Sequence, residues 1–191
     1  MIRKKVIGLA LVAATVPLLQ GCFPLAVTGA AMGSLVASDR RTTGTYVEDE
    51  SIEWKAIAKW RDKFPGSHIN ATSFNRRVLL TGEVPSEDAR KQVEEMVRTI
   101  ENVKEVTNEL QVAGASSIAS RGSDSLVTSN VKARMVNNPR FSPTHIKVVT
   151  EASVVYLMGL VTQSEADAAV EITRTTSGVN RVVKVFEYIS K

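Results

Sequence analysis

Hydrophobic and polar positions along the chain form a repeated pattern after residue 47. In each copy, two runs rich in β-branched and aliphatic residues are separated by a short polar turn, which predicts a β-hairpin. The first hairpin is expected over 69–84 and the second over 146–161. Gly82 and Gly159 stand at the same place, each two residues before a valine. A glycine there marks a bulge, a bend or a close backbone approach, so we expect the two copies to share one backbone.

Apolar positions at helical spacing flank each hairpin. They recur from Ala89 to Ile100 after the first hairpin and from Ala166 to Thr173 after the second. The run Thr162-Gln163-Ser164-Glu165 has the spacing of a capping box. A third β-rich run follows each of these helices, and a further helix is expected before each hairpin, at about 50–64 and about 125–136. The order α-β-β-α-β, found twice, predicts an α+β fold of two small tandem domains.

A targeting segment precedes the repeat. Arg3, Lys4 and Lys5 are followed by the uncharged, mostly apolar stretch 6–19, which is typical of a secretory signal. The run Leu19-Gln20-Gly21-Cys22 resembles the bacterial lipoprotein box. That resemblance implies that the Cys22 thiol receives a diacylglycerol, that cleavage occurs before it, and that the new amino group is acylated. The alternatives are a free buried cysteine or an uncleaved membrane anchor.

The anchor alternative arises because 6–38 carries no charge, but Pro17, Gly21 and Pro24 interrupt that stretch. By resemblance to lipoprotein sorting, Phe23 after the cysteine favours the outer membrane. We therefore predict five segments. They are a signal peptide (1–21), a lipidated tether (22–47), a first domain (48–112), a linker (113–120) and a second domain (121–191).

Two short motifs connect the repeat to a known family. They are Val78-Leu79-Leu80-Thr81-Gly82 in the first copy and Val155-Tyr156-Leu157-Met158-Gly159-Leu160-Val161-Thr162 in the second. Each copy resembles a BON domain, and a lipoprotein box with two such domains is similar to the dual-BON outer-membrane lipoproteins. The resemblance implies a lipid-anchored protein that faces the periplasm, is enriched at the division site and supports envelope integrity. It also implies that the second domain binds anionic phospholipid.

Signals for catalysis and cofactor binding are poor. One cysteine excludes an internal disulfide, and His68 and His145 lie far apart with no cysteine near either, so we expect no metal site. No Gly-x-Ser-x-Gly run or phosphate-binding loop occurs. The acidic pairs at 87–88 and 94–95 are interpreted as solvated helix charge. The sequence therefore predicts a protein without catalytic residues or cofactor, and not an enzyme.

Net charge argues against a nucleic-acid partner. The formal charge of +4 falls to +1 once the three basic residues of the signal peptide are removed. The two domains differ in sign: 48–112 contains ten basic and thirteen acidic residues, and 121–191 contains nine basic and six acidic residues. A positive second domain near a membrane attracts anionic headgroups, although attraction between the two domains or a chance excess of basic residues explains the difference equally well.

The first helices of the two copies have different patterns. In the first copy, Ile57, Trp60 and Phe64 predict a core stripe, and Trp54 is also expected in the core. In the second copy, Val127, Val131 and Met135 form one stripe. A second line lies on the opposite side of that helix and consists of Leu126, Ser129, Ala133 and Val136. A helix that is apolar on two sides has two partners.

Three partners fit that second line: the bilayer, the other domain or another protein. Lys132 and Arg134 flank it and favour anionic lipid such as phosphatidylglycerol or cardiolipin. The family resemblance points to the same helix, although relatives can carry an aromatic residue where Leu126 stands. We therefore predict lipid contact through Leu126, Ser129, Lys132, Ala133, Arg134 and Val136. The alternative is an adaptor for envelope-assembly or cell-wall proteins.

Overall fold

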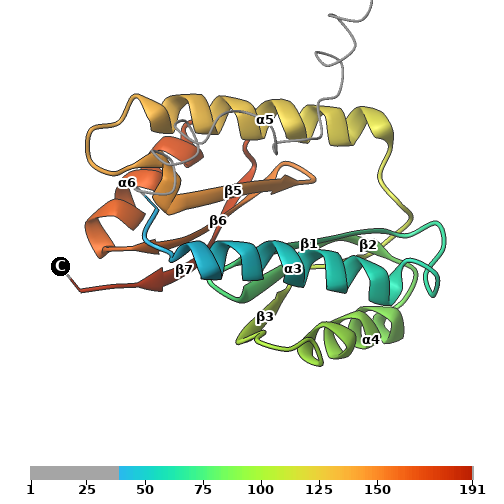
Figure 1. The fold of residues 1–191 in the computed structure, drawn as a ribbon. Coiled ribbons are helices and arrows are strands. Elements are labelled where there is room, and N and C mark those ends of the chain that lie inside the picture. The colour runs from blue at the N-terminus through green and yellow to red at the C-terminus, as the bar shows by residue number, and fades with distance from the viewer. Residues whose placement is uncertain (1–38, 191) are drawn as a thin grey trace, which may run out of the picture. The chain divides into compact units, whose positions relative to one another are not determined.

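The computed structural model describes residues 39–190. The predicted signal peptide, Cys22 and most of the predicted tether lie outside the described residues. The described part has the predicted α+β architecture, with two units in the order α-β-β-α-β (Figure 1).

The first domain begins earlier than expected. Its elements are α3 (Thr43–Trp60), β1 (His68–Phe74), β2 (Arg77–Val84), α4 (Glu87–Arg98), β3 (Glu105–Asn108) and β4 (Gln111–Val112). Helix α3 starts inside the segment assigned to the tether because the Thr42 side chain accepts a hydrogen bond from the Thr45 N–H, an N-cap that the pattern of apolar residues does not reveal. The expected third strand is divided into β3 and β4.

The second domain also begins earlier, within the predicted linker. Its elements are α5 (Ile118–Val136), the 3-10 turn η2 (Pro143–His145), β5 (Ile146–Glu151), β6 (Val154–Val161), α6 (Gln163–Arg174) and β7 (Arg181–Tyr188). The Ser117 side chain caps α5 by accepting a hydrogen bond from the Ser120 N–H. The capping box predicted between Thr162 and Glu165 is confirmed at the start of α6.

Both predicted hairpins are confirmed, and each belongs to a mixed sheet. Strand β2 pairs antiparallel with β1 and parallel with β3 and β4. Strand β6 likewise pairs antiparallel with β5 and parallel with β7. The parallel pairs arise because helices α4 and α6 cross over the sheet between the two strands that they connect.

A helix aspartate fixes the turn of each hairpin. The two residues of each turn have positive φ: Asn75 and Arg76 in the first domain, and Ala152 and Ser153 in the second. That conformation is strained for residues with a side chain. Buried Asp49 of α3 accepts hydrogen bonds from the N–H groups of the first turn, at 2.8 and 2.7 Å. Asp124 of α5 does the same for the second, at 3.0 and 2.8 Å, so each first helix holds its own hairpin in place.

The two strand glycines make the close backbone approach that their positions predicted. A Cβ at Gly82 would overlap the carbonyl oxygen of His68, and one at Gly159 would overlap the carbonyl oxygen of His145. Gly82 also has φ of +108°, which side-chain-bearing residues rarely adopt. Both hairpins therefore depend on glycine at this point.

The central strands are buried on both faces. Side chains of β2 and β6 alternate between two environments. One set, Val78, Leu80, Val84, Val155, Leu157 and Val161, packs under the helices of its own domain. The other set includes Leu79, Tyr156 and Met158, which form a third cluster with Phe74 between the two sheets. Continuous apolar runs in the sequence reflect this double burial.

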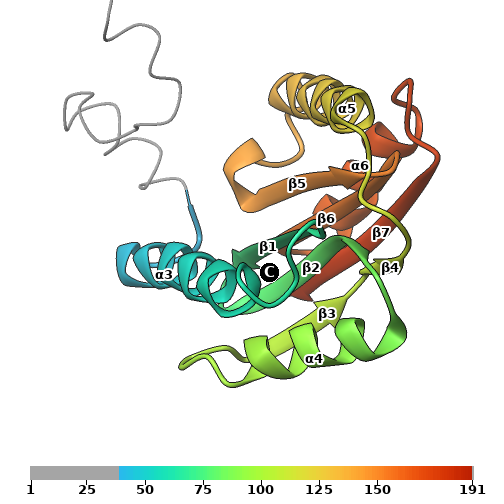
Figure 2. The ribbon, with the colours of Figure 1, turned by 90° about the vertical axis from the view of Figure 1, so that its right-hand side faces the viewer.

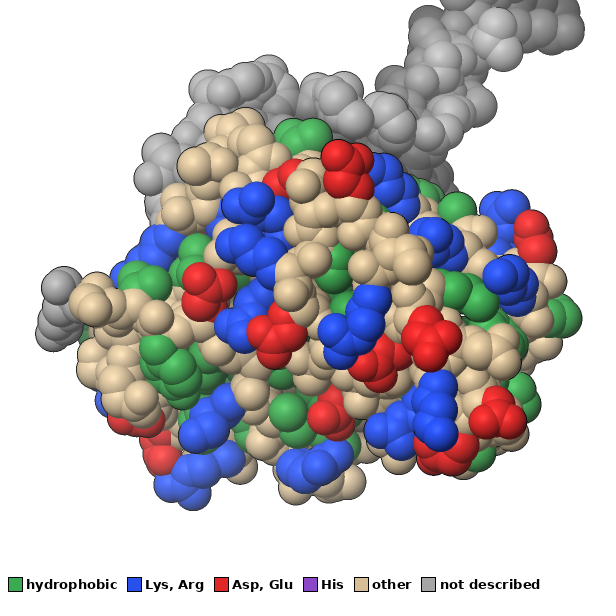
Figure 3. Space-filling model, turned by 90° about the horizontal axis from the view of Figure 1, so that it is seen from below, with side chains coloured by type: hydrophobic (Ala, Val, Ile, Leu, Met, Phe, Trp, Pro, Cys, Tyr) green, Lys and Arg blue, Asp and Glu red, His purple; other side chains and the backbone are tan. Residues whose placement is uncertain are grey.

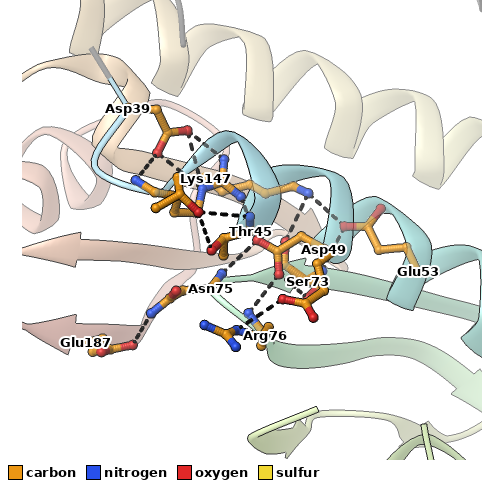
Figure 4. Close-up of polar contacts among 12 residues, drawn as sticks. Asp39, Thr45, Asp49, Glu53, Ser73, Asn75, Arg76, Lys147 and Glu187 are labelled. Atoms are coloured by element: carbon orange, nitrogen blue, oxygen red, sulfur yellow. Dashed lines mark hydrogen bonds and ion pairs between the residues drawn. The ribbon is translucent and has the colours of Figure 1, made fainter. Parts of the chain in front are cut away.

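The sheets therefore pack face to face, with α3 and α4 outside one and α5 and α6 outside the other (Figure 2). Polar contacts at the edge of this interface join the domains (Figure 4). Lys147 Nζ of β5 lies 2.8 Å from Glu53 Oε1 of α3, and Asn75 donates to Glu187 of β7 at 2.8 Å. Just before α3, Arg40 forms a bidentate pair with Glu165 of α6, at 2.8 Å for each bond.

One core prediction is wrong. Trp60 is buried, but Trp54 is 70% exposed and Ile57 is 37% exposed. The observed stripe is Ile52, Ala56 and Trp60, because the hydrogen bonds of Asp49 to the hairpin turn fix the rotation of α3. Trp54 follows Ile52 by two positions, about 200° around the helix, and so points away from the sheet.

Candidate functional site

Helix α5 shows the two-sided pattern that the sequence indicated. Val127, Val131 and Met135 are buried against the sheet and α6, as predicted. Asp124 shares this inner face, where its carboxylate holds the β5–β6 turn. The inner face is therefore occupied by the fold, and only the outer face is available for another molecule.

The outer face carries three large exposed apolar side chains. Ile118 is 83% exposed, Leu126 is 68% exposed and Val136 is 65% exposed, in a structure that includes both domains. The first domain is therefore not the second partner of α5. Sequence reasoning missed Ile118 because it assigned 113–120 to a linker, whereas the spacing from Ile118 to Val136 corresponds to five full helical turns and repeats the same face. From Ile118 to Val136 the helix is about 27 Å long.

Small side chains separate the large ones. Ser129 and Ala133 are exposed between Leu126 and Val136. The Ser129 hydroxyl donates to the Ser125 carbonyl oxygen at 2.9 Å, so its polar atom already has a partner within the helix. The outer face therefore has small side chains between Leu126 and Val136, which are the large apolar side chains on either side of them.

The basic residues predicted as lipid contacts differ in their surroundings. Lys132 is exposed and forms no ion pair among the described residues. Arg134 donates from Nη1 to the Ile172 carbonyl oxygen at 2.8 Å and to Thr176 Oγ1 at 2.6 Å, and from Nη2 to Thr175 Oγ1 at 2.9 Å. Arg134 therefore ties α5 to the end of α6, a role that the sequence did not suggest.

A hollow adjoins the outer face beside Arg134. It has a volume of about 370 Å³ and lies between α5 and the end of α6. Its lining consists of Asn130, Ala133, Arg134, Thr175, Thr176 and Ser177. Amide, guanidinium and hydroxyl groups of this kind donate hydrogen bonds to anionic oxygens.

Acidic residues are few near this surface. The sole acidic residue of α5 is Asp124, and it is buried on the inner face. By contrast, the side of the molecule around α4 shows Lys and Arg interspersed with Asp and Glu (Figure 3). There, Glu87 pairs with Arg90 and Glu94 pairs with Arg98, as expected for solvated helix charge.

Two carboxylates with shifted pKa values, Glu165 and Glu151, are not part of the outer face of α5. Hydrogen bonds from Arg40 lower the pKa of Glu165 to about 2, and those from Thr162 add to this effect. Burial raises the pKa of Glu151, and the charge of nearby Glu83 acts in the same direction. In the described part of the chain, the group that could hold a metal ion consists of His68, Glu83 and Glu151, which lie where the domains meet.

None of the described helices is both long enough and apolar enough to cross a bilayer. The predicted acylation site, Cys22, lies outside the described residues.

Comparison with known proteins identifies both repeats. The BON domain model matches residues 53–114 and 123–190. The chain is 41% identical over 174 residues to the outer membrane lipoprotein DolP of Haemophilus influenzae, covering 90% of each chain. It is 32% identical over 154 residues to a 21 kDa hemolysin of Actinobacillus pleuropneumoniae, covering 79% of each. It is 28% identical over 160 residues to the osmotically inducible protein Y of Escherichia coli, covering 81% of this chain and 80% of the relative.

Proposed function

The chain belongs to the BON-domain family as an outer-membrane lipoprotein of the DolP type, and from this premise we propose that its second BON domain binds anionic phospholipid. In this proposal the protein faces the periplasm, is enriched at the division site and supports envelope integrity. It also has no enzymatic activity in this proposal. The observation that carries the proposal is the row of exposed apolar side chains on the outer face of α5.

Insertion of that row into the headgroup region supplies the apolar part of binding. Fully burying one such side chain is worth about 1.5–3 kcal/mol. Ile118, Leu126 and Val136 lie on the same side of one helix and can enter a flat interface together. A helix that lies in the membrane plane with its apolar face inward is a common mode of peripheral binding.

Basic groups beside the row select anionic lipid. Each basic residue close to an anionic surface contributes about 1 kcal/mol. Lys132 is exposed on α5, and Arg121 and Arg140 are exposed near its two ends. Arg134 uses three of its five N–H donors within the protein, so two remain for a headgroup phosphate in the adjoining hollow.

The lipid on Cys22 and the α5 face act as two signals. An acylated cysteine already keeps the protein at a membrane, so the second contact forms at high effective concentration and need not be tight. The α5 contact therefore determines which lipids the protein binds and how the protein is oriented on the membrane, whereas the acyl chains attach it.

Liposome flotation tests the proposal on residues 23–191 without the lipid anchor. Both domains are kept, because removal of the first would expose Tyr156 and Met158 of the sheet interface. We expect flotation with vesicles containing phosphatidylglycerol or cardiolipin and none with phosphatidylcholine alone. Leu126→Glu should weaken binding at least tenfold, because it replaces an apolar contact worth about 1.5–3 kcal/mol with a repelled charge.

Val47→Glu is the matched control, because Val47 is 62% exposed on the equivalent helix of the first domain. It should leave binding unchanged. Circular dichroism should show both variants folded, whereas Val131→Glu, at a fully buried position, should unfold the second domain. A folded Leu126→Glu protein that floats like the parent would refute the proposal.

The second candidate function is a protein adaptor, favoured by one observation on the first domain. Trp54 is 70% exposed on α3, and tryptophan is enriched among the residues that dominate protein interfaces. Envelope integrity in cells separates the two functions. If Trp54→Ala makes cells sensitive to detergent while lipid binding is intact, the adaptor function is the main one. If Leu126→Glu makes cells sensitive to detergent and Trp54→Ala does not, lipid binding is the main function.

A further inference from the structure

A second group of ligand-type side chains lies at the junction of the two domains, away from the outer face of α5. His68 begins β1, Glu83 lies near the end of β2, and Glu151 ends β5 of the other domain. Their ligand atoms all lie within 4.8 Å of one another. His68 Nδ1 is 3.1 Å from Glu83 Oε2 and 3.6 Å from Glu151 Oε1.

These spacings match those around a tetrahedral metal ion. Ligand atoms at about 2.0–2.1 Å from Zn²⁺ lie roughly 3.4 Å from each other in that geometry. The two distances from His68 Nδ1, 3.1 and 3.6 Å, fall on either side of this value. Small side-chain rotations would therefore suffice to place all three ligands on one ion.

The charge of the group also favours a cation. The side chains of Glu83 and Glu151 are each only 9% exposed, and among the described residues neither pairs with lysine or arginine. Two other buried carboxylates have such a partner, Arg41 for Asp49 and Arg40 for Glu165, and a third, Asp124, accepts hydrogen bonds from two backbone N–H groups of the β5–β6 turn. One imidazole can neutralise one carboxylate at most, and buried charges are either paired or bound to metal.

Neighbouring groups can support a metal-bound histidine. With Nδ1 on the ion, Nε2 carries the ring proton, and it lies 3.0 Å from the Asn70 side-chain amide. In the structure the amide nitrogen also donates to Glu151 Oε2 at 3.3 Å, and a 180° flip of the amide would give up that hydrogen bond and present its oxygen to Nε2 as the acceptor. The Ser116 N–H donates to Glu83 Oε2 at 3.0 Å and holds that carboxylate in place. Supporting contacts of this kind orient ligands in known metal sites.

The group is accessible from solvent. A cavity of about 230 Å³ adjoins it, lined by His68, Asn70 and Glu151 together with Arg121, Asp124, Ser125, Thr128 and Thr150. It has room for water molecules that complete the coordination. A ligand set of one imidazole and two carboxylates suits Zn²⁺ and related first-row ions better than Mg²⁺ or Ca²⁺, which take oxygen ligands.

We propose that His68, Glu83 and Glu151 bind a divalent first-row transition-metal ion that joins the two BON domains. His68 and Glu83 belong to the first domain and Glu151 to the second, so the ion bridges the sheets at one end of their interface. The sequence indicated no such site, because its ligands come from strands 15 and 68 residues apart along the chain, with neither cysteine nor a second histidine nearby. The proposal is independent of the lipid-binding face.

Calorimetry and thermal unfolding of the untagged two-domain protein test the proposal, after treatment with EDTA and with ZnCl₂ as the probe. We expect one equivalent of Zn²⁺ to bind. At a hundredfold excess over the dissociation constant, the melting temperature should rise by about 5–10 °C. MgCl₂ at the same concentration should produce no comparable rise.

Glu83→Gln and Glu151→Gln keep the size of the side chain and remove its charge, so both variants should fold and lose the Zn²⁺-dependent rise. His145→Gln is the matched control, since His145 occupies the equivalent place before β5 and is not part of the group. It should bind Zn²⁺ like the parent. The proposal is overturned if the parent shows neither heat nor a thermal shift at about 100 μM Zn²⁺, a concentration that covers micromolar dissociation constants. It is equally overturned if the two glutamine variants bind as the parent does.

Discussion

Helices α3 and α5 have the same inner face and different outer faces. Counted from Asp49 and Asp124, the buried residues of both helices fall at the same offsets: Ile52, Ala56 and Trp60 in one, and Val127, Val131 and Met135 in the other. Both aspartates hold the turn of the hairpin that follows. The inner faces agree because both must satisfy one sheet and one turn.

The outer faces both expose large apolar side chains but differ in charge. Helix α3 exposes Val47 and Trp54 beside the exposed carboxylate of Glu50. Helix α5 exposes Ile118, Leu126 and Val136 and has no acidic residue on that side. Function in a repeat of this kind is therefore to be sought where the copies differ and the fold imposes no requirement. The following substitutions test which positions the fold controls.

The largest effect is expected at the strand glycines, where both copies share the same backbone contact. Gly82→Val combines overlap with the His68 carbonyl and a φ of +108°, so it should cost more than about 3 kcal/mol of unfolding free energy. At Gly159 an added side chain overlaps the His145 carbonyl, but the backbone has no positive φ there. Gly159→Val should therefore cost about 1–3 kcal/mol of unfolding free energy. Urea denaturation measures both values.

Gly114→Val is the control for the glycine pair, since no atom lies within 4 Å of an added Cβ there. It should leave the midpoint unchanged. If Gly159→Val is as stable as the parent, the two hairpins do not need glycine for the same reason.

The next largest effect is expected at Asp49 and Asp124, the aspartates that hold the hairpin turns. As with the strand glycines, the substitution in the first domain should cost more stability than the one in the second. Asp49 accepts hydrogen bonds from both turn N–H groups, the Ser73 hydroxyl and the guanidinium of Arg41. Asp124 accepts only the two turn N–H groups among the contacts of the described residues. Asp49→Ala should cost about 3 kcal/mol and Asp124→Ala about 1–2 kcal/mol, because each removal leaves buried donors without an acceptor. Equal losses in thermal unfolding would contradict this ranking.

A smaller effect, dependent on pH, is expected at the contact between Arg40 and α6. The pKa of Glu165 is about 2, below its ordinary value of 4.5, and Arg40 is the largest cause. The stabilisation is present above pH 4.5 and is lost as the pH falls towards 2. Arg40→Met should lower stability at pH 7 by about 1–3 kcal/mol.

Denaturation of both proteins between pH 7 and pH 2 checks this prediction. The curves of the parent and of Arg40→Met should draw together as the pH falls towards 2, where Glu165 is about half protonated in the parent and the carboxylate is progressively lost. A difference that is the same at every pH would show that Arg40 acts through packing and not through the carboxylate.

The smallest effect concerns surface charge and distinguishes the two outer faces directly. Lys132→Glu on α5 should weaken binding to anionic vesicles by about tenfold at low salt, consistent with about 1 kcal/mol for each charge that is lost or reversed. Lys59→Glu on α3 should change nothing. Because exposed charges are screened beyond about 10 Å at 0.1 M salt, the effect of Lys132→Glu should shrink as salt is added. Vesicle co-sedimentation at several salt concentrations measures it.

The sequence was sufficient to predict the repeat, the hairpins and the inner stripe of α5, because each depends on local spacing. It failed at Trp54, since the rotation of α3 is set by hydrogen bonds that Asp49 accepts from a turn 26 and 27 residues away. It also failed at the starts of α3 and α5. Those starts depend on the side-chain caps of Thr42 and Ser117 rather than on apolar periodicity.

The candidate site was predictable only in part. The exposure of Leu126 and Val136 follows from their spacing opposite the core stripe, and their contact with lipid stays a prediction. The bonds of Arg134 to the end of α6 and the grouping of His68 with Glu151 could not be anticipated. Both depend on how elements distant in the chain meet, which no local pattern encodes.

The aspartate ties also have a consequence for the order of folding. They connect residues 26–29 positions apart, whereas the pair of Arg40 with Glu165 closes a loop of 125 residues. Short loops close at lower entropic cost, and proteins with local contacts fold faster. Each helix and its hairpin should therefore assemble early as a local nucleus, and docking of the two sheets should be the late, slower phase. Under that order, Asp124→Ala should slow the first phase of refolding, while Met158→Ala should mainly speed unfolding.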